Sequence, residues 1–258
     1  MPDIHPTAQV DVRAELASDV EVGAFSVIGP HVVIDSGTKI APHVVLTGRT
    51  RIGKNNRIFQ FASIGDISQD KKYHGEDVTT TIGDGNTIRE CVTINAGTVQ
   101  DRGDTRIGDD NWILAYTHIA HDCVVGNHTV FSNVAQLAGH VHIGDYATMG
   151  GMCAIHQFCR IGAHAMIGGG TMVLQDVPPY VTVFGHLAKP SGINSEGLRR
   201  RGFSKEAILA IKRAYKTLYR NGLTLAEARA QIAAEADTES VLQILLEFIS
   251  AEGRGIVR

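Results

Sequence analysis

An apolar residue recurs at every sixth position through the first two thirds of the chain. A period of six fits neither an amphipathic helix nor an alternating strand. It predicts a parallel β-helix, in which each repeat supplies one short strand and one corner. Three repeats make one coil of a triangular prism, so residues about eighteen apart lie above one another at roughly the 4.8 Å strand spacing. The recurring residues are Ile4, Val10, Leu16, Val22, Ile28, Ile34, Ile40, Leu46, Ile52, Ile58 and Ile64, then Ile82, Ile88 and Ile94, and then Ile107 and every sixth residue to Val173.

The repeat is interrupted twice before it ends. The interruptions predict inserted loops near residues 66–81 and 99–106, and insertions in such solenoids often form the binding surface. After the repeat, Ser204 is placed to cap a helix, Thr224 and Glu227 form a capping box for a second, and a third is expected over residues 238–250. We therefore predict a parallel β-helix over residues 1–190, followed by a small α-helical domain over residues 191–258.

Composition narrows the class of protein. The chain has 258 residues and a net charge of −3, which does not suggest a nucleic-acid partner. No apolar run reaches the roughly 20 residues of a membrane span, so stable membrane insertion is not expected. The repeat begins at Ile4 and leaves no room for a signal peptide, which makes the cytoplasm the expected compartment. The cysteines lack C-x-x-C spacing, so we expect buried thiols rather than a zinc site or disulfides.

The helical part is strongly basic at its start. Residues 195–222 carry eight Lys or Arg against two Glu. A basic face on a mildly acidic protein suggests an acidic partner. A solvated surface or a contact between subunits explains the same composition, and both interpretations stay open.

Histidines crowd into residues 118–156, and the eighteen-residue spacing sorts them into two adjacent columns. The columns are His121, Gly139 and Gln157, and beside them Asp122, His140 and Phe158. An imidazole at His121 can take a proton from an alcohol, and Asp122 favours the imidazolium that forms. The N–H of Gly139 can donate to an oxyanion. These are the parts of an acyl-transfer site.

Other interpretations of the same histidines remain. His118, at a neighbouring corner, and His121 have the spacing of half a metal site, although zinc needs three or four converging ligands and the stacked positions hold Gly and Gln. No metal is therefore expected. A non-catalytic β-helix scaffold would not require this stacking of His, Gly and Gln beside an Asp.

Six segments of the chain carry a family resemblance. Residues 115–123 read Ala-Tyr-Thr-His-Ile-Ala-His-Asp-Cys and residues 137–141 read Leu-Ala-Gly-His-Val. Together with residues 60–65, 156–159, 176–181 and 196–203, they resemble the UDP-N-acetylglucosamine O-acyltransferase family, whose members begin lipid A synthesis. The resemblance covers nearly the whole chain. It implies that the β-helix is left-handed and that the protein is a homotrimer with active sites between subunits.

The resemblance also implies roles for individual residues. His121 becomes the general base, Asp122 its partner and the N–H of Gly139 the oxyanion donor. Expected contacts to substrate are His118, His140, His156 and Gln157 in the cleft, Asp70 and Lys72 on the sugar nucleotide, and Asn194, Glu196, Arg200 and Arg201 near the nucleotide or its phosphates. The expected ruler of acyl-chain length is Gly169, with Met166 and Leu187 beside it. One departure is that Asn95-Ala96 stands where relatives commonly have His-Arg.

The implied reaction transfers a 3-hydroxyacyl chain from acyl carrier protein to the 3-hydroxyl of UDP-N-acetylglucosamine. The acyl group arrives on the carrier's phosphopantetheine, so no metal or diffusible cofactor is expected, and the basic helical segment would meet the acidic carrier. The alternatives are the related N-acyltransferase of the same pathway, which has an extra N-terminal domain, and an acetyl-CoA-dependent acetyltransferase. The acyl-chain length, and the choice between the plain sugar and its 3-amino analogue, stay open.

Overall fold

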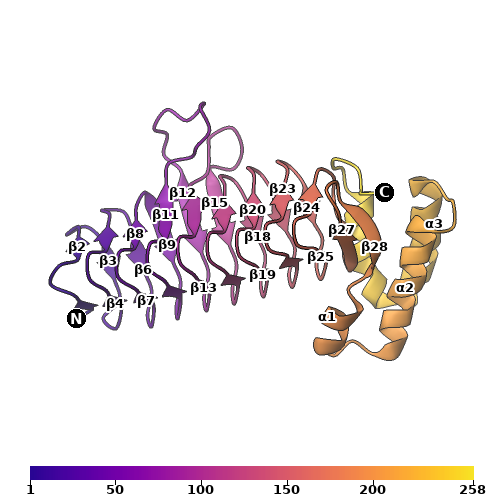
Figure 1. Cartoon of the computed structure of the whole chain (residues 1–258), viewed down its shortest axis with the longest axis horizontal. Coiled ribbons are helices and arrows are strands. Elements are labelled where there is room, and N and C mark those ends of the chain that lie inside the picture. The colour runs from indigo at the N-terminus through magenta and orange to yellow at the C-terminus, as the bar shows by residue number, and fades with distance from the viewer.

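The computed structural model describes residues 1–258 and shows a left-handed parallel β-helix with helices at its C-terminal end (Figure 1), which confirms the predicted fold class. The strands form three sheets, one for each face of the prism. Sheet 1 consists of β1 (Asp3–Ile4), β4 (Glu21–Val22), β7 (Lys39–Ile40), β10 (Arg57–Ile58), β13 (Thr87–Ile88), β16 (Trp112–Ile113), β19 (Val130–Phe131), β22 (Thr148–Met149), β25 (Met166–Ile167), β27 (Val181–Phe184) and β28 (Lys189–Ile193).

The other two sheets complete the prism. Sheet 2 consists of β2 (Gln9–Val10), β5 (Val27–Ile28), β8 (Val45–Leu46), β11 (Ser63–Asp66), β14 (Thr93–Asn95), β17 (His118–Ile119), β20 (Gln136–Leu137), β23 (Ala154–Ile155) and β26 (Met172–Val173). Sheet 3 consists of β3 (Glu15–Leu16), β6 (Val33–Ile34), β9 (Arg49–Ile52), β12 (Thr79–Ile82), β15 (Asp104–Ile107), β18 (Val124–Val125), β21 (His142–Ile143) and β24 (Arg160–Ile161). The chain turns from sheet 1 to sheet 2 at corner 1, from sheet 2 to sheet 3 at corner 2, and from sheet 3 to sheet 1 at corner 3.

The six-residue rhythm places one apolar side chain of each repeat inside the prism. Residues such as Ile52, Ile64 and Ile119 are fully buried, and a single core of 40 buried residues runs through the stacked coils. Residues that pair between neighbouring coils are mostly eighteen positions apart in the sequence, as are Ile119 and Leu137. Many corner residues have a left-handed backbone, for example Asp122 with a φ of 58°. The small residue four positions after the apolar one lies inside, which buries three of the four free cysteines.

Both inserted loops leave the prism at corner 2, in consecutive coils (Figure 1). The first, residues 67–78, joins β11 to β12, and the second, residues 96–103, joins β14 to β15. The first is shorter than the predicted 66–81 because the flanking strands continue beyond the repeat, and the second has the length of the predicted 99–106 but lies three residues earlier, because β15 already begins at Asp104. Strand β12 begins at Thr79, and β15 begins at Asp104 and pairs with β12 over four residues. The next turn of corner 2 carries His121 and Asp122.

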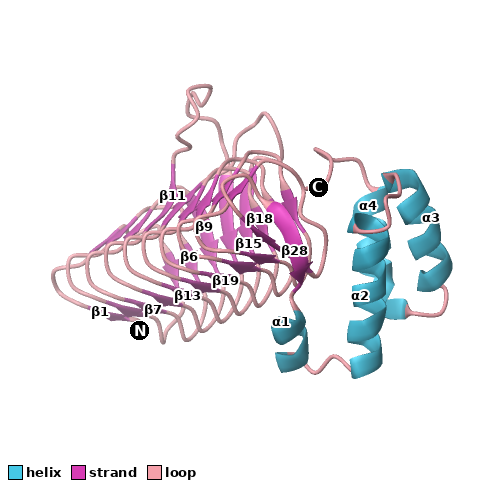
Figure 2. Ribbon diagram, turned by 45° about the vertical axis from the view of Figure 1, so that its right-hand side comes forward, coloured by secondary structure: helices cyan, strands magenta, loops and turns pink.

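The helical domain packs at the C-terminal end of the prism (Figure 2). Sheet 1 continues to Ile193, three residues beyond the predicted boundary, because β28 pairs antiparallel with β27. The domain consists of α1 (Ser195–Arg200), α2 (Lys205–Tyr219), α3 (Leu225–Ala236), a 3₁₀ turn (Ser240–Leu242) and α4 (Gln243–Ser250). The caps at Ser204 and Thr224 are present as predicted, whereas α1 was not anticipated.

Two contacts tie the helical domain to the last coil. Arg160 of β24 pairs with the fully buried Asp176 at 2.7 Å, and its guanidinium lies 4.6 Å from the ring centroid of Phe248 in α4. Tyr180 donates a hydrogen bond of 2.7 Å to the carbonyl of Val241. None of the four α-helices has the length and apolar character that crossing a bilayer would require.

Candidate active site

His121 and Asp122 form a hydrogen-bonded pair at corner 2. The Nδ1 atom of His121 lies 2.8 Å from Oδ2 of Asp122; the imidazole is 13% exposed and the carboxylate is fully buried. Burial acts to raise the pKa of Asp122, but hydrogen bonds from His121 and Thr98 outweigh it and lower that pKa below its ordinary value. An ionised carboxylate only accepts, so Nδ1 carries the proton and Nε2 is left with a free lone pair.

Gly139 lies directly against the imidazole, one coil above it. A Cβ atom at this position would lie 2.6 Å from Nε2 and 2.5 Å from Cε1 of His121, so any side chain here would displace the ring. The backbone N–H of Gly139 donates to no acceptor within the chain. Corner 2 therefore brings a basic nitrogen and a free N–H donor together, as the sequence columns predicted.

Two further histidines flank the pair. His140 stands edge-on to His121 with ring centroids 4.9 Å apart, stacks on Phe158 at 4.3 Å, and bonds to Asp101 through Nδ1 at 2.7 Å. His118 lies in β17 rather than at a corner, because the strand begins one residue before the buried Ile119. Its Nδ1 bonds to Thr93 Oγ1 at 2.7 Å. Burial, followed by the charge of His121, lowers the pKa of His118.

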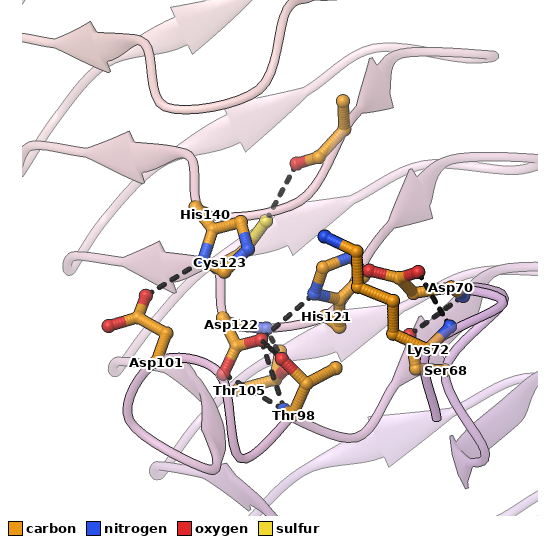
Figure 3. A network of polar contacts seen from close by, with 11 residues as sticks. Ser68, Asp70, Lys72, Thr98, Asp101, Thr105, His121, Asp122, Cys123 and His140 are labelled. Atoms are coloured by element: carbon orange, nitrogen blue, oxygen red, sulfur yellow. Dashed lines mark hydrogen bonds and ion pairs between the residues drawn. The ribbon is translucent and has the colours of Figure 1, made fainter. Parts of the chain in front are cut away.

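Thr98 was not anticipated from the sequence. It lies in the second inserted loop and donates both its backbone N–H and its hydroxyl to Asp122 (Figure 3). The break between Ile94 and Ile107 was visible in the sequence, but the loop predicted within it, residues 99–106, did not include Thr98, and nothing identified which residue would turn inward. Asp101, from the same loop, is the partner of His140.

The first inserted loop carries Asp70 and Lys72 to the same corner. In the view of Figure 3 they lie on the side of His121 opposite to Asp122. Asp70 accepts the backbone N–H of Lys72 at 3.0 Å, and the Lys72 side chain is exposed. The unusual Asn95 anchors this loop, because its Nδ2 donates to the carbonyl of Ile67 at 3.0 Å. Asn95 therefore has a local structural function at this corner.

The remaining substrate candidates divide between two corners. His156 and Gln157 lie at corner 2, one coil above Gly139. The others lie at corner 3: Arg201 stands 5.0 Å over the ring of Tyr146, and Asn194 donates to the carbonyl of His164 at 3.0 Å while capping α1.

Two charged candidates of α1 are paired with each other. Glu196 bonds to Arg200 at 3.0 Å, and both side chains are exposed. A single chain therefore does not bring the α1 residues to the same corner as His121.

The expected ruler residues lie elsewhere on the prism. Met166 is half-buried in β25 of sheet 1, and Gly169 is exposed at corner 1. A Cβ atom on Gly169 would lie 3.3 Å from the carbonyl of Gly151, with no positive φ to strain it. Leu187 is exposed in the connection between β27 and β28.

Three side chains at corner 2 are close enough to consider a metal ion. Ligand atoms of His121, Asp122 and His140 lie within 4.8 Å of one another. Protein partners already hold three of the candidate atoms, because Asp122 Oδ2 accepts from Thr98 and pairs with His121 Nδ1, and His140 Nδ1 bonds to Asp101. The arrangement fits acid-base chemistry better than the three or four converging ligands of a zinc site.

Comparisons with known proteins extend over the full chain. Residues 176–257 match the family described as UDP N-acetylglucosamine O-acyltransferase, domain 2, and residues 13–48 and 104–134 match bacterial transferase hexapeptide repeats. The chain is 60% identical to the acyl-[acyl-carrier-protein]–UDP-N-acetylglucosamine O-acyltransferase of Janthinobacterium sp. (strain Marseille), with 99% of each covered.

Solved structures agree over the same length. LpxA of Acinetobacter baumannii is 49% identical with a TM-score of 0.96, and 99% of each chain is covered. The UDP-N-acetylglucosamine acyltransferase of Francisella novicida is 45% identical with a TM-score of 0.97, covering 99% of this chain and 94% of that one. The similarity therefore includes both the prism and the helical domain.

Proposed function

The chain belongs to the UDP-N-acetylglucosamine O-acyltransferase family and is an acyltransferase, and from this premise we propose how its own residues perform the transfer. The acceptor is the 3-hydroxyl of UDP-N-acetylglucosamine, and the donor is a 3-hydroxyacyl thioester on acyl carrier protein. The product begins lipid A synthesis. The observation that carries this proposal is the His121–Asp122 pair with the free N–H of Gly139 stacked against it.

The pair acts as general base and then as general acid. Nε2 of His121 takes the proton of the sugar hydroxyl, whose oxygen bonds to the thioester carbonyl carbon. The N–H of Gly139 donates to the oxyanion of the tetrahedral intermediate. When the C–S bond breaks, the imidazolium returns its proton to the leaving thiolate. Asp122 stabilises the imidazolium between these two transfers.

The donor brings its own chemistry, so the reaction needs no further cofactor. The acyl group stays on the carrier's phosphopantetheine until attack, and no Ser or Cys stands in the column with His121. The thiol nearest to the pair, Cys123, is fully buried, and burial raises its pKa to about 12, so it is not a nucleophile. We expect activity to survive treatment with a chelator.

The protein is proposed to work as a homotrimer in the cytoplasm. Corner 1 exposes apolar side chains along its length, and monomeric proteins rarely leave such a stripe uncovered. The exposed residues are Phe25, Phe61, Tyr116, Val134 and Met152. A second copy also explains why the α1 candidates and His121 lie at different corners of one chain.

Complementation between subunits tests this arrangement. Inactive His121→Ala and Arg201→Ala chains, refolded together, should regain part of the wild-type turnover, because some mixed interfaces then hold both intact residues. Light scattering should give the mass of three chains. A monomeric active protein would contradict the proposed assembly.

The direct test of the function is a donor and acceptor screen. Purified protein is incubated with UDP-N-acetylglucosamine or its 3-amino analogue, and with acyl carrier thioesters or acetyl-CoA, and products are read by mass spectrometry. The proposal expects acylated sugar nucleotide from the carrier thioester alone. Acetylation from acetyl-CoA would favour the alternative acetyltransferase. A glucosamine nucleotide is included as a third acceptor, and acylation of its amine alone would favour the N-acyltransferase.

Chain length is proposed to depend on Gly169. Gly169 is exposed at corner 1, where a Cβ would lie close to the carbonyl of Gly151 and a longer side chain would extend into the space outside the corner. Wild type should prefer a longer 3-hydroxyacyl donor, and Gly169→Met should shift the product ratio toward the shorter one by roughly tenfold, the lower end for a methylene in an apolar pocket. Competition between short and long thioesters measures this ratio. An unchanged ratio would place the ruler elsewhere.

A further inference from the structure

The carboxylate of Asp122 is held by more than its histidine. Its Oδ2 accepts from His121 Nδ1 at 2.8 Å and from the hydroxyl of Thr98 at 2.6 Å, and the backbone N–H of Thr98 lies 3.0 Å from both carboxylate oxygens. Thr98 and Asp122 are both buried. A buried carboxylate with several donors is fixed in orientation, because each rotation away from them leaves a charged oxygen without a partner.

The second inserted loop is folded around this threonine. The carbonyl of Thr98 accepts the N–H groups of Asp101 and Gly103, at 3.3 and 3.0 Å. Gly97 must be glycine, because a Cβ there would collide with the backbone of Gly103 and Asp104. These backbone bonds close the loop without the hydroxyl of Thr98. The hydroxyl is therefore free to serve Asp122, as Figure 3 shows.

We propose that Thr98 is a positioning residue for the general base, acting on His121 through Asp122. This inference rests on the proposed function of the same site. The Thr98 hydroxyl and the His121 imidazole share one carboxylate oxygen, so the hydroxyl fixes the oxygen that orients the ring. The inserted loop thereby completes a chain of three side chains, Thr98, Asp122 and His121, that ends at Nε2.

The arrangement has a consequence for pH dependence. Burial acts to raise the pKa of Asp122, and the bonds from His121 and Thr98 lower it. Removing one donor weakens this lowering, so Asp122 becomes protonated at a higher pH. Activity at acidic pH should therefore be lost earlier in a variant without the hydroxyl. The other titratable groups around this pair are His140 with its partner Asp101, His118, and Asp70 and Lys72 of the first inserted loop.

Thr98→Val and Thr98→Ser provide the test. Thr98→Val should lower kcat by about 10- to 100-fold, the range of one hydrogen bond to a charged group, with the KM values within about twofold. The acidic limb of its pH–rate profile should move to higher pH. Thr98→Ser should restore both, because it restores the hydroxyl.

Thr129→Val is the matched control. Thr129 is likewise buried and donates its hydroxyl at 2.6 Å, but to Asn111 at corner 3. It should change the melting temperature without moving kcat or the acidic limb. If Thr98→Val does not fold, Thr98→Ala is measured at a temperature where circular dichroism shows it folded.

Two failures are distinguishable in this experiment. A non-donating Thr98 variant with normal kcat and an unmoved acidic limb would overturn the inference and leave the proposed function intact. A Thr98→Ser variant as slow as Thr98→Val would also overturn it, since packing rather than the hydroxyl would then matter. Absence of acyl transfer by the wild type would instead refute the proposed function.

Discussion

Corners 2 and 3 of the prism carry similar residues but differ in what packs against them. Corner 2 stacks His140 on Phe158, and corner 3 stacks His164 between Tyr146 and Tyr180, with centroids 4.9 and 5.6 Å away. At corner 2 two inserted loops arrive; the second gives His140 its carboxylate partner Asp101, whereas the partner of His121 is the adjacent Asp122 of the same turn. At corner 3 the helical domain packs instead, with Arg201 over the ring of Tyr146 and Phe203 against the ring of His164.

The two corners show that a repeat position does not by itself decide the chemistry of a histidine. Burial, and then the charge of Arg201, lower the pKa of His164 to about 4, and its buried Nδ1 has no hydrogen-bond partner. His164 therefore stays neutral and packs. His121 keeps a partly open edge and a carboxylate on Nδ1. The neighbours present at each corner decide whether the imidazole keeps an open edge and a carboxylate partner or is only packed.

Replacing the base should give the largest difference between the corners. His121→Ala should lose at least about 100-fold in turnover, the low end for a removed general base, with an unchanged melting temperature. The control is His128→Ala, which removes a corner-3 histidine stacked on Tyr146 and should leave turnover near normal. Near-normal turnover in His121→Ala would move the base elsewhere, with His118 the first candidate.

Lys72 tests whether the first inserted loop belongs to the site at corner 2. Lys72→Ala should raise the KM for the sugar nucleotide by about tenfold, since a charge-assisted hydrogen bond to the substrate is lost, and leave stability unchanged. Steady-state kinetics with Lys71→Ala, an exposed neighbour in the same loop, provide the control. A change confined to the KM for the carrier protein would place the sugar elsewhere.

The basic segment beside corner 3 tests whether the helices meet a partner. Arg199 and Arg200 pair with Glu196, whereas Lys205, Lys212, Lys216 and Arg220 lack a carboxylate within salt-bridge distance and remain free to attract an acidic carrier. The KM for acyl carrier protein should rise severalfold as salt rises, because screening shortens the field to about 8 Å near physiological ionic strength. The double variant Lys212→Gln, Lys216→Gln should flatten this dependence. A flat wild-type response would assign these charges to the fold.

The smallest effect is expected for His164→Phe. At neutral pH its stability and turnover should stay close to wild type, since an apolar ring replaces a buried nitrogen that has no partner. The wild type should lose stability as pH falls from 6.5 toward 4, because the unfolded chain binds a proton that the folded His164 refuses. Thermal melts across this range should show a smaller loss in the variant. An equal loss would contradict the neutral assignment of His164.

The coils follow from the sequence alone, because one inward residue in six leaves few ways to bury Ile52, Ile64 and Ile119 together. It also placed His121, Asp122 and Gly139 in adjacent columns, since stacking fixes neighbours eighteen residues apart. The helix caps at Ser204 and Thr224 were likewise local signals, set by hydrogen bonds within one turn.

The corner that each insertion contacts could not be predicted before the fold was known. Thr98 reaches Asp122 across a break in the repeat, and Arg201 reaches Tyr146 from a helix that follows the prism. No period relates these residues, because loops and helices dock through shape and hydrogen bonds that form only when the coils are already stacked. The six-residue period fixes the contacts between repeats. The contacts of the inserted loops and of the helical domain depend instead on the surface of the folded prism.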